Sequence, residues 1–574
     1  MNKFINLIRV NHKSICTALI LAVFTLINIS LVYRTFYIDS ASNIHSTYEG
    51  YGDIPLHLTQ ISKFAFSQNF DLVDPIYYGS NLQYPFLFNF LRGILLSWTN
   101  SWTFSVLWPL FLIIIANTIL VYLIYSKILK NSWLAIISMF VFFLGSGFNW
   151  IYSTFFNYNF SSFRLDMNYP LQNIDFAAPI ITMINQHTFY FGLFLFLLAT
   201  YLTIKLFESK KLSYILFAIL TVCIIPISHT HSFVAIGILL ISFVISGLLF
   251  KEINFSKKIF MVGFVGAIIA IPQMFYLLVG KSIGNFTMFR LGWMIKEGIG
   301  AVNFSNGALR SIFSLSFINF LWINLGLIFP LFIFGLVILF VYLRKNFPNK
   351  DKNEDMFFIS SFTLSGFIIF ILVQLVQFQP WDFDNNKLLV YFLFFAAPLM
   401  VWALKYSLRN YNKVFVTILI SISILITLSG IFDIYYRLKI SKQDLPVVFN
   451  AEDIKLADYI RKNIDENVLI LTGTSHKNPI DSLAGMKVLL GYEGWLWTRG
   501  IDYSKRQKEI SNFFKIPTRE NSLFRDYPIG YILYDESVKV QFGANSASLD
   551  KLFDRVYQSG EYILYLFSKK VDSK

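Results

Sequence analysis

Long apolar runs constrain this chain more than any other feature of its sequence. A helix needs about 20 apolar residues to cross the hydrocarbon core of a bilayer. Eleven runs of roughly that length occur, at residues 15–33, 104–125, 133–148, 187–204, 212–228, 233–250, 259–279, 316–343, 357–377, 388–404 and 414–434. Hydrophobic residues make up 55% of the 574 residues and charged residues 14%, which excludes a soluble enzyme, a secreted domain and a disordered scaffold. We therefore expect a polytopic α-helical membrane protein with about 11 transmembrane helices.

The basic residues indicate how these spans are oriented. Cytoplasmic loops of membrane proteins carry an excess of Lys and Arg. Lys3, Arg9 and Lys13 place the N-terminal segment in the cytoplasm. Alternation from there puts the short basic loops on the same side, with Lys127, Lys130, Lys205, Lys210, Lys211, Lys251, Lys257, Lys258, Arg344, Lys345, Lys350, Lys352, Lys405, Arg409 and Lys413. The C-terminus then lies outside, and the net charge of +14 reflects orientation, so we expect no nucleic-acid partner.

The long segments between spans all fall on the outer side. They are residues 34–103, 149–186, 280–315 and the region from about 435. We expect a transmembrane domain at 1–434 and a small extracytoplasmic α/β domain at 435–574. In the latter, periodicity predicts helices over Ala451–Ile464 and Tyr503–Phe514, strands over Val468–Leu471 and Ile529–Tyr534, and a hairpin over Val556–Phe567 that turns at Ser559-Gly560.

The first outer loop contains an acidic residue and a histidine at helical spacing. Asp53 and His57 are four residues apart, so a helix that opens at Pro55 can direct both toward one cavity. A carboxylate beside an imidazole suits general-base chemistry. Alternatively, Asp53 is an N-cap that satisfies the first turn of that helix. Spacing alone leaves both interpretations open.

A histidine pair follows the fifth span, in Ser228-His229-Thr230-His231. Two imidazoles at this spacing could bind a metal ion or donate hydrogen bonds to phosphate oxygens. They could equally be helix-end histidines that bond to loop carbonyls. If the protein uses a divalent ion such as Mg²⁺ or Mn²⁺, Asp53, His229 and His231 are the candidate ligands.

A lysine stands at the start of the tenth span, after Trp381, Asp384 and Asn385. A cation is unfavourable at the positive end of a helix, so Lys387 is an unusual residue there. A bound anion would resolve the conflict, because lysine and the free N–H groups of a helix start both attract phosphate. The alternative is a lysine that reaches the interface beside a belt tryptophan.

Other polar groups on the outer side are weaker candidates. Gln186 and His187 follow Asn185 at the start of the fourth span and could contact a substrate. The second outer loop contains Arg164 and Asp166, and the third contains Arg290 and Arg310. These could bind substrate, or they could be ordinary interface and loop residues.

The distribution of charge separates the function classes. The apolar runs contain almost no ionisable residues, whereas ion-coupled transporters usually need them near the bilayer midplane. The polar candidates gather at the outer ends of the spans, which favours a site at the outer membrane surface. A transporter or flippase of lipid-linked saccharides and a non-catalytic glycan-binding membrane protein are the alternatives.

Several stretches resemble the GT-C superfamily of membrane glycosyltransferases, and most closely a group of multi-spanning GT-C-like proteins of bacteria and archaea. The matching stretches are 52–57, 185–187, 227–231, 322–326, 381–387 and 491–497, with Asp502, Tyr503 and Arg506. Further acidic residues are Glu49 in the first outer loop and Asp166 and Asp175 in the second.

This resemblance implies a function. Members of the superfamily transfer a sugar from a polyprenyl-phosphate or polyprenyl-pyrophosphate donor to an acceptor, which here could be a glycolipid, a polysaccharide or a protein. The resemblance implies that Asp53 is the catalytic base, and that Lys387, His229 and His231 hold the departing phosphate. We expect His57, Gln186, His187, Trp381, Asp384 and Asn385 to contact substrate, and the reaction to be inverting at the outer face of the plasma membrane.

Overall fold

The computed structural model describes most of residues 2–567. The residues left out within that range are 48–49, 51, 68–69, 149–177, 185, 210, 279–287, 290–317, 319–320, 323, 347–352, 379–381 and 411. The chain divides into two compact units. The helical unit contains 1–32, 110–275 and 287–441, and the mixed unit contains 33–109, 276–286 and 442–574.

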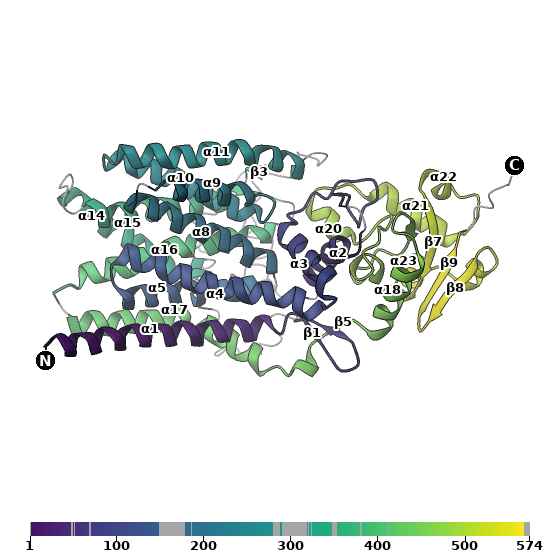
Figure 1. Ribbon diagram of the computed structural model, residues 1–574, viewed down its shortest axis with the longest axis horizontal. Helices are drawn as coiled ribbons and strands as arrows, with labels where there is room; N and C mark the ends of the chain where they lie inside the picture. Colours follow the sequence, from purple (N-terminus) through teal and green to yellow (C-terminus); the bar gives the residue numbers. More distant parts are fainter. Residues whose placement is uncertain are drawn as a thin grey trace. The chain divides into compact units, whose positions relative to one another are not determined.

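The helical unit is built from apolar helices of 6 to 31 residues (Figure 1). They are α1 (Asn2–Val32), α4 (Trp102–Leu129), α5 (Ser132–Leu144), α7 (Pro179–Ile184), α8 (His187–Glu208), α9 (Leu212–Ile224), α10 (Thr230–Leu249), α11 (Ile253–Leu278), α14 (Ile328–Asn346), α15 (Asn353–Leu375), α16 (Asn386–Ser407) and α17 (Asn412–Lys439). Two short strands, β3 (Met288–Phe289) and β4 (Val376–Gln377), pair antiparallel. A 3₁₀ turn, η4 (Asp382–Asn385), leads into α16.

Nine helices among the described residues are long and apolar enough to cross a membrane, so the chain is a multi-pass membrane protein. The predicted spans 133–148 and 212–228 correspond instead to α5 and α9, which have 13 residues each. Pro226 lies two residues after the end of α9 and has no N–H with which to continue a helix. Nine of the 11 expected spans thus correspond to helices long enough to cross a membrane, and the count of 11 stays a prediction.

The predicted span 316–343 is interrupted. Gly326 adopts a positive φ of 49°, and its N–H donates to the carbonyls of Leu321 and Trp322. This left-handed residue ends one helical turn, and α14 begins only at Ile328. Apart from Asn324 the sequence is apolar on both sides of Gly326, so hydrophobicity alone did not reveal the break.

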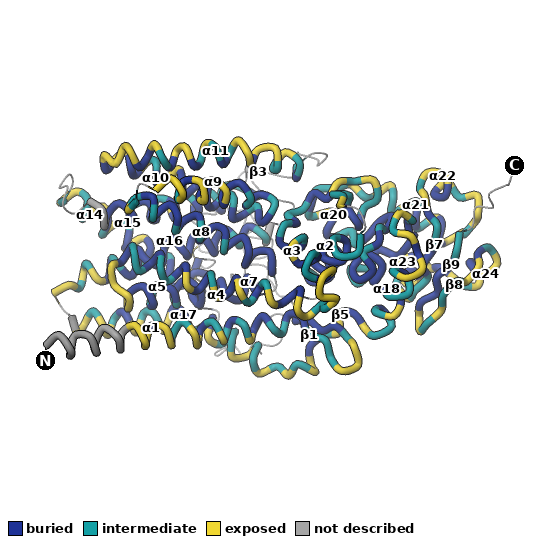
Figure 2. The backbone as a smooth tube through the Cα atoms, viewed as in Figure 1, coloured by how far each residue is buried: buried dark blue, intermediate teal, exposed yellow. Residues whose placement is uncertain are grey.

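Helix α16 forms the core of the helical unit. Its residues are buried almost throughout, whereas α11 keeps an exposed apolar side (Figure 2). A helix that is hydrophobic all round must be surrounded by other helices. Tyr125 of α4 donates a hydrogen bond to the Phe394 carbonyl, and Gly335 of α14 lies against Leu399. The middle of α16 is therefore held by α4 on one side and α14 on another.

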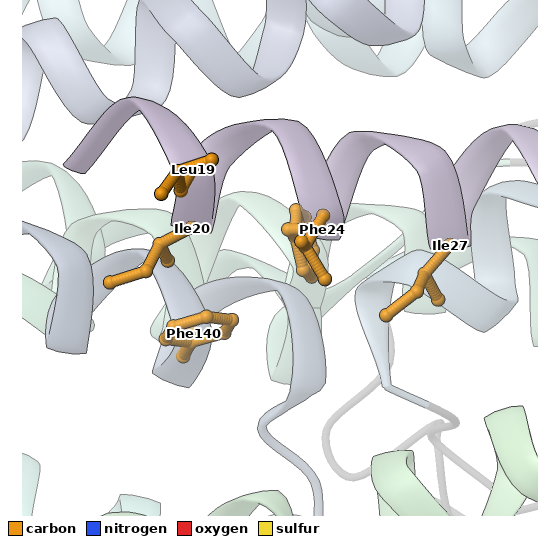
Figure 3. A pocket seen from close by; sticks show the side chains of 6 residues that line it. Leu19, Ile20, Phe24, Ile27 and Phe140 are labelled. Carbon is orange, nitrogen blue, oxygen red and sulfur yellow. The ribbon is translucent and has the colours of Figure 1, made fainter. Parts of the chain in front are cut away.

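An apolar pocket of about 340 Å³ lies between α1 and α5 (Figure 3). Its lining residues are Leu19, Ile20, Val23, Phe24, Ile27 and Phe140. These side chains have no group that could donate or accept a hydrogen bond, and none that titrates. The pocket is therefore suited to hydrocarbon, and the chemistry must be sought elsewhere.

The mixed unit combines two sheets with short helices. One sheet has the antiparallel order β1-β2-β5, from Tyr37–Ile38, Ile44–His45 and Val447–Phe449. The other has the order β6-β7-β9-β8, from Leu469–Leu471, Ile529–Tyr534, Tyr562–Leu566 and Asp554–Ser559. Only the β6–β7 pair in this second sheet is parallel. The helices are α2 (Asp53–Phe66), α3 (Leu87–Thr99), α18 (Ala451–Asn463), α19 (Pro479–Ser482), α20 (Glu493–Thr498), α21 (Ser504–Lys515), α22 (Leu523–Asp526), α23 (Glu536–Phe542) and α24 (Ser546–Asp550), with a 3₁₀ turn η5 (Lys442–Asp444).

The elements predicted after residue 435 are confirmed. Helix α18 begins at Ala451 because Asn450 and Asp453 form a reciprocal capping box. Strand β7 covers Ile529–Tyr534 as predicted, and β8 and β9 form the hairpin. Gly560 takes a φ of 57° at its turn, as the Ser559-Gly560 pair predicted.

The mixed unit is larger than the predicted domain at 435–574, because the first outer loop belongs to it. Leu56 of α2 and Ile76 share a hydrophobic core with β6 and β7. The Gly491 N–H donates to the Ile76 carbonyl at 2.7 Å, and the Val488 N–H donates to the Pro75 carbonyl at 2.9 Å. The loop that carries Asp53 and the C-terminal region therefore fold as one body.

Candidate functional site

His229 is fixed at the start of α10. It is the N-cap residue, and its Nδ1 accepts a hydrogen bond from the Ser232 backbone N–H at 3.3 Å. Its ring stacks on Phe189 of α8, with 4.7 Å between ring centroids. A side chain at Gly192 would place a Cβ only 2.4 Å from the His229 Cβ, so only glycine leaves room for this histidine. His229 is thus a helix-end histidine, as one interpretation of the sequence expected. Its hydrogen-bond partner is Ser232 rather than a loop carbonyl.

His231 lies beside His229, with 5.5 Å between their ring centroids. It is only 8% exposed, and its Nε2 has no hydrogen-bond partner among the residues that the structure describes. It interacts electrostatically with both Lys387 and Asp384. The two histidines and the lysine, which are far apart in the sequence, are therefore neighbours within the helical unit.

Lys387 has a partner that the helix-dipole argument did not consider. Its Nζ lies 3.0 Å from Oδ2 of Asp384, in the 3₁₀ turn that leads into α16. An acidic residue at a helix N-terminus offsets the unfavourable placement of a cation. The ion pair is mostly buried, with side-chain exposures of 12% for Lys387 and 24% for Asp384. The lysine is therefore held in place at the helix start.

Two residues of this cluster were not predicted from the sequence. The Ser232 hydroxyl lies 2.7 Å from His229 Nδ1 and is hydrogen-bonded on its other side to the Tyr391 hydroxyl. Tyr391 is four residues after Lys387, on the same face of α16. Only their spacing in the sequence could have indicated them, because Ser232 is three residues after His229 and Tyr391 is four residues after Lys387. We call His229, His231, Ser232, Asp384, Lys387 and Tyr391 the histidine–lysine cluster.

The remaining candidates of the helical unit lie at helix starts. Asn385 is buried, and its amide bonds the Val376 carbonyl at 2.6 Å and the Phe378 N–H at 3.3 Å, so both ends of the amide are used within the protein. Gln186 occupies the N-cap position of α8 without capping it, and His187 is buried in the first turn. Contact of these residues with substrate stays a prediction.

Several candidates lie outside the described residues. They are Glu49, Arg164, Asp166, Asp175, Asn185, Arg290, Arg310 and Trp381.

Asp53 and His57 belong to the mixed unit. Helix α2 begins at Asp53 rather than at Pro55, and its N-cap is Gly52, so the N-cap interpretation of Asp53 does not hold. His57 is buried, and its Nδ1 lies 3.1 Å from the Asn89 amide nitrogen, which also donates to Gln60. An amide nitrogen can only donate, so the His57 Nδ1 is an acceptor. The meeting of Asp53 with the histidine–lysine cluster stays a prediction, since the two belong to different units.

Helix α2 is fastened to the C-terminal part of the mixed unit. The Ser62 hydroxyl donates to the Asp481 carbonyl at 3.0 Å, and the Thr59 hydroxyl donates to the Asp481 carboxyl. Lys63 pairs with Asp71, whose other oxygen lies 3.2 Å from Lys487 Nζ. Burial raises the pKa of Asp481 to about 7. Asp53 therefore stands on a helix whose position depends on residues more than 400 positions later.

Metal ligands are few in the described part of the chain. No group of three or more His, Cys, Asp or Glu side chains that could hold a metal ion occurs among those residues. His229 already uses Nδ1 at the cap, and two imidazoles alone fall short of the ligand number that divalent ions take. The described residues do not fit a metal ion at the two histidines.

The fold is similar to that of the archaeal oligosaccharyltransferase AglB from Archaeoglobus fulgidus, solved in complex with an inhibitory peptide and a dolichol-phosphate. The two chains are 12% identical, with a TM-score of 0.52 over 98% of this chain and 75% of that one. The Archaeoglobus fulgidus oligosaccharyltransferase complexed with Zn and sulfate gives 12% identity and a TM-score of 0.48, over 90% of this chain and 68% of that one.

ArnT from Cupriavidus metallidurans, bound to undecaprenyl phosphate, gives 10% identity and a TM-score of 0.47, over 97% of this chain and 99% of that one. No family model and no curated protein matches the sequence. The fold predicted by the sequence motifs is confirmed by the similarity to AglB. The chain has the fold of AglB, which is the fold that the resemblance in the sequence motifs implies.

Proposed function

We propose that this protein transfers a sugar from a polyprenyl-phosphate or polyprenyl-pyrophosphate donor to an acceptor, with inversion at the anomeric carbon. The acceptor is a glycolipid, a polysaccharide or a protein, and the reaction takes place at the outer face of the plasma membrane. The GT-C fold supports this reaction class, since the AglB structure of the same fold was solved with a dolichol-phosphate. The N-terminus lies inside and the C-terminal domain outside.

The histidine–lysine cluster carries the proposal. The buried Nε2 of His231 has no partner among the described residues, and Lys387 stands beside it at the start of a 22-residue helix. A cation, imidazole N–H groups and the free N–H groups of a helix start all attract phosphate oxygens. A phosphate or pyrophosphate headgroup supplies the partner that His231 Nε2 lacks among the described residues, and a second anionic partner for Lys387.

The chemistry is a single displacement. An acceptor hydroxyl or amide attacks the anomeric carbon, and the bond from that carbon to the phosphate oxygen breaks with its electron pair. The phosphate departs with an additional negative charge, which Lys387, His229 and His231 stabilise. Asp53 takes the proton of the attacking group, so the charges balance without a further reactant.

The supporting residues have narrower tasks. His57 lies one turn after Asp53 on α2, and its ring is held by Asn89, so it can orient groups near the base. Asp384 holds Lys387 until the donor arrives. We assign Gln186, His187, Trp381 and Asn385 to donor or acceptor contacts at the helix starts.

The test uses the full chain in sealed proteoliposomes, with radiolabelled undecaprenyl-phosphate and undecaprenyl-pyrophosphate sugars as donors and a mixture of membrane glycolipids, polysaccharide and peptide as acceptors. We expect transfer of label by the wild type. Asp53→Asn should lose nearly all transfer while it still binds undecaprenyl phosphate, because the amide cannot take a proton.

Glu520→Gln is the matched control, because Glu520 is an exposed carboxylate of the mixed unit. It should transfer at the wild-type rate. Full transfer by Asp53→Asn would show that Asp53 is not the catalytic base. A wild type that moves labelled lipid across the bilayer without transfer would instead support a flippase.

A further inference from the structure

The two ring nitrogens of His229 have different surroundings. Nδ1 faces back toward α10, where the Ser232 backbone N–H donates to it at 3.3 Å and the Ser232 hydroxyl lies at 2.7 Å. Nε2 is on the opposite side of the ring, and neither of the two hydrogen bonds that this side chain makes with described residues involves it. The side chain as a whole is buried.

The bonds at Nδ1 determine the tautomer. A backbone N–H can only donate, so Nδ1 must accept and carries no proton. The Ser232 hydroxyl then also donates to Nδ1, and its oxygen accepts from the Tyr391 hydroxyl. Hydrogen bonds at one ring nitrogen decide which nitrogen is protonated. The imidazole is therefore neutral, with its proton on Nε2.

The ring plane is held as firmly as the tautomer. Phe189 stacks on one face with an interplanar angle of 16°, and Gly192 leaves no free space behind the His229 Cβ. The ring centroid of His231 is 5.5 Å away, and Lys387 interacts electrostatically with His229. The Nε2–H group of His229 is thus a third hydrogen-bond donor beside His231 and Lys387.

We propose that His229 divides its two nitrogens between two tasks: Nδ1 caps α10, and Nε2–H donates a neutral hydrogen bond to the phosphate of the lipid-linked donor. Ser232 and Tyr391 are positioning residues that keep the proton on Nε2. This inference rests on the proposed function, since it names how one residue of that site recognises the donor. A neutral donor suits a buried site, because an imidazolium there would add a second desolvated cation beside Lys387.

Two amide substitutions separate the tasks. In His229→Asn the amide oxygen can replace Nδ1 as the cap, since asparagine is a favoured N-cap residue, but nothing reaches the Nε2 position. In His229→Gln the longer side chain places an N–H near the Nε2 position and gives up the cap. Binding of undecaprenyl phosphate to the full chain in detergent micelles is measured for both variants and for His229→Ala, together with the melting temperature.

We expect His229→Gln to bind within about threefold of the wild type, and His229→Asn and His229→Ala to bind roughly 10- to 100-fold more weakly, the effect of one hydrogen bond to a charged group. The melting temperature of His229→Asn should be nearest that of the wild type, because this variant keeps the cap. The melting temperatures of His229→Gln and His229→Ala should be lower. Asn131→Ala, which removes the cap of α5, should lower the melting temperature without changing binding.

The pH dependence provides an independent readout. The affinity ratio of wild type to His229→Gln should stay constant between about pH 6 and pH 8, where an ordinary imidazole titrates. A ratio that rises as the pH falls would mean that His229 binds as imidazolium and would overturn the inference. Binding by His229→Asn that equals the wild type would also overturn it, with the proposed function intact. A wild type that does not bind undecaprenyl phosphate at all would remove the proposed function itself.

Discussion

The Thr59 hydroxyl donates a hydrogen bond of 3.3 Å to Oδ1 of Asp481, a residue 422 positions later in the chain. Thr59 lies six residues after Asp53 on α2, and the Ser482 hydroxyl also donates to the same carboxyl oxygen. Oδ2 of Asp481 is buried and has no partner among the described residues. The helix that carries the proposed base is thus held by a carboxyl group that is only half satisfied.

This carboxyl should make the mixed unit less stable as the pH rises. Burial raises the pKa of Asp481 from 3.8 to about 7, against the opposing effect of the two hydroxyl donors, and Asp74 is the charge that raises it further. The folded unit therefore binds the proton more tightly than the unfolded chain. The free energy of unfolding should fall from about pH 4 to pH 7 and stay low above that.

Asp481→Asn should remove this dependence, because the amide oxygen still accepts from Thr59 and Ser482 and carries no charge. At about pH 8 we expect the variant to be more stable by on the order of a few kcal/mol, at about 1.4 kcal/mol per pKa unit. Melting temperatures measured from about pH 5 to pH 8 check this. Asp526→Asn, an exposed carboxylate of the same unit, is the control. Parallel profiles for Asp481→Asn and wild type would contradict the prediction.

The Lys387–Asp384 pair predicts two changes of opposite sign. Lys387→Ala should raise the KM for the donor at least tenfold and leave the KM for the acceptor nearly unchanged, because the charge is lost only at the phosphate. Asp384→Asn should lower the donor KM, since it releases the lysine from an ion pair of 3.0 Å. Titration of each substrate at saturating levels of the other distinguishes the cases. Equal effects on both substrates would argue against phosphate binding.

Gly192 predicts a packing defect at the histidine. An alanine there would put its Cβ 2.4 Å from the His229 Cβ and 2.5 Å from the Ser232 hydroxyl oxygen, so the histidine must move. Gly192→Ala should cost about 1–3 kcal/mol of stability and weaken donor binding. Gly237→Ala is the matched control, because nothing lies within 4 Å of its added Cβ and alanine favours the helix. Thermal unfolding and donor binding are measured together. Wild-type behaviour of Gly192→Ala would mean that the contact is not tight.

The buried Asp74–Arg499 ion pair predicts a large loss of stability. Their charged atoms are 2.6 Å apart, and both side chains are at least 95% buried, with 1% and 5% exposure. Arg499→Met should cost about 3–5 kcal/mol, because it leaves a buried carboxylate without its cation. The double variant with Asp74→Asn should recover part of that loss. Denaturant midpoints of the two variants test this, and an equal loss in both would mean that the charge is not the cause.

Local patterns in the sequence predicted the elements of the mixed unit well. Period-two alternation located β7 at Ile529–Tyr534 without error, and the Ser559-Gly560 pair located the hairpin turn. Spacing also placed Asp53 and His57 on one helix. These features depend on residues within a few positions of each other, so they can be predicted from the chain alone.

Partnerships across the chain could not be predicted in this way. Ser232 and Tyr391 are 159 positions apart, and their hydrogen bond depends on how α10 packs against α16. The pairing of Lys387 with Asp384 could not be predicted for a different reason. A bound anion and a nearby carboxylate would each offset the unfavourable placement of a cation at a helix start. The break at Gly326 was hidden because the residues around it, apart from Asn324, are apolar.

The sequence by itself determined that most of this chain lies in a bilayer, since no other solvent accommodates so many apolar residues, and it determined where most helices and strands occur. Only the tertiary structure decided that the first outer loop folds with the C-terminal region, and that His229, His231 and Lys387 are neighbours. The physical reason is that hydrophobicity and local spacing depend on each residue and its close neighbours in the chain. The partner of a buried polar group depends instead on which distant segments pack beside it, and many sequences of the same pattern could pack differently.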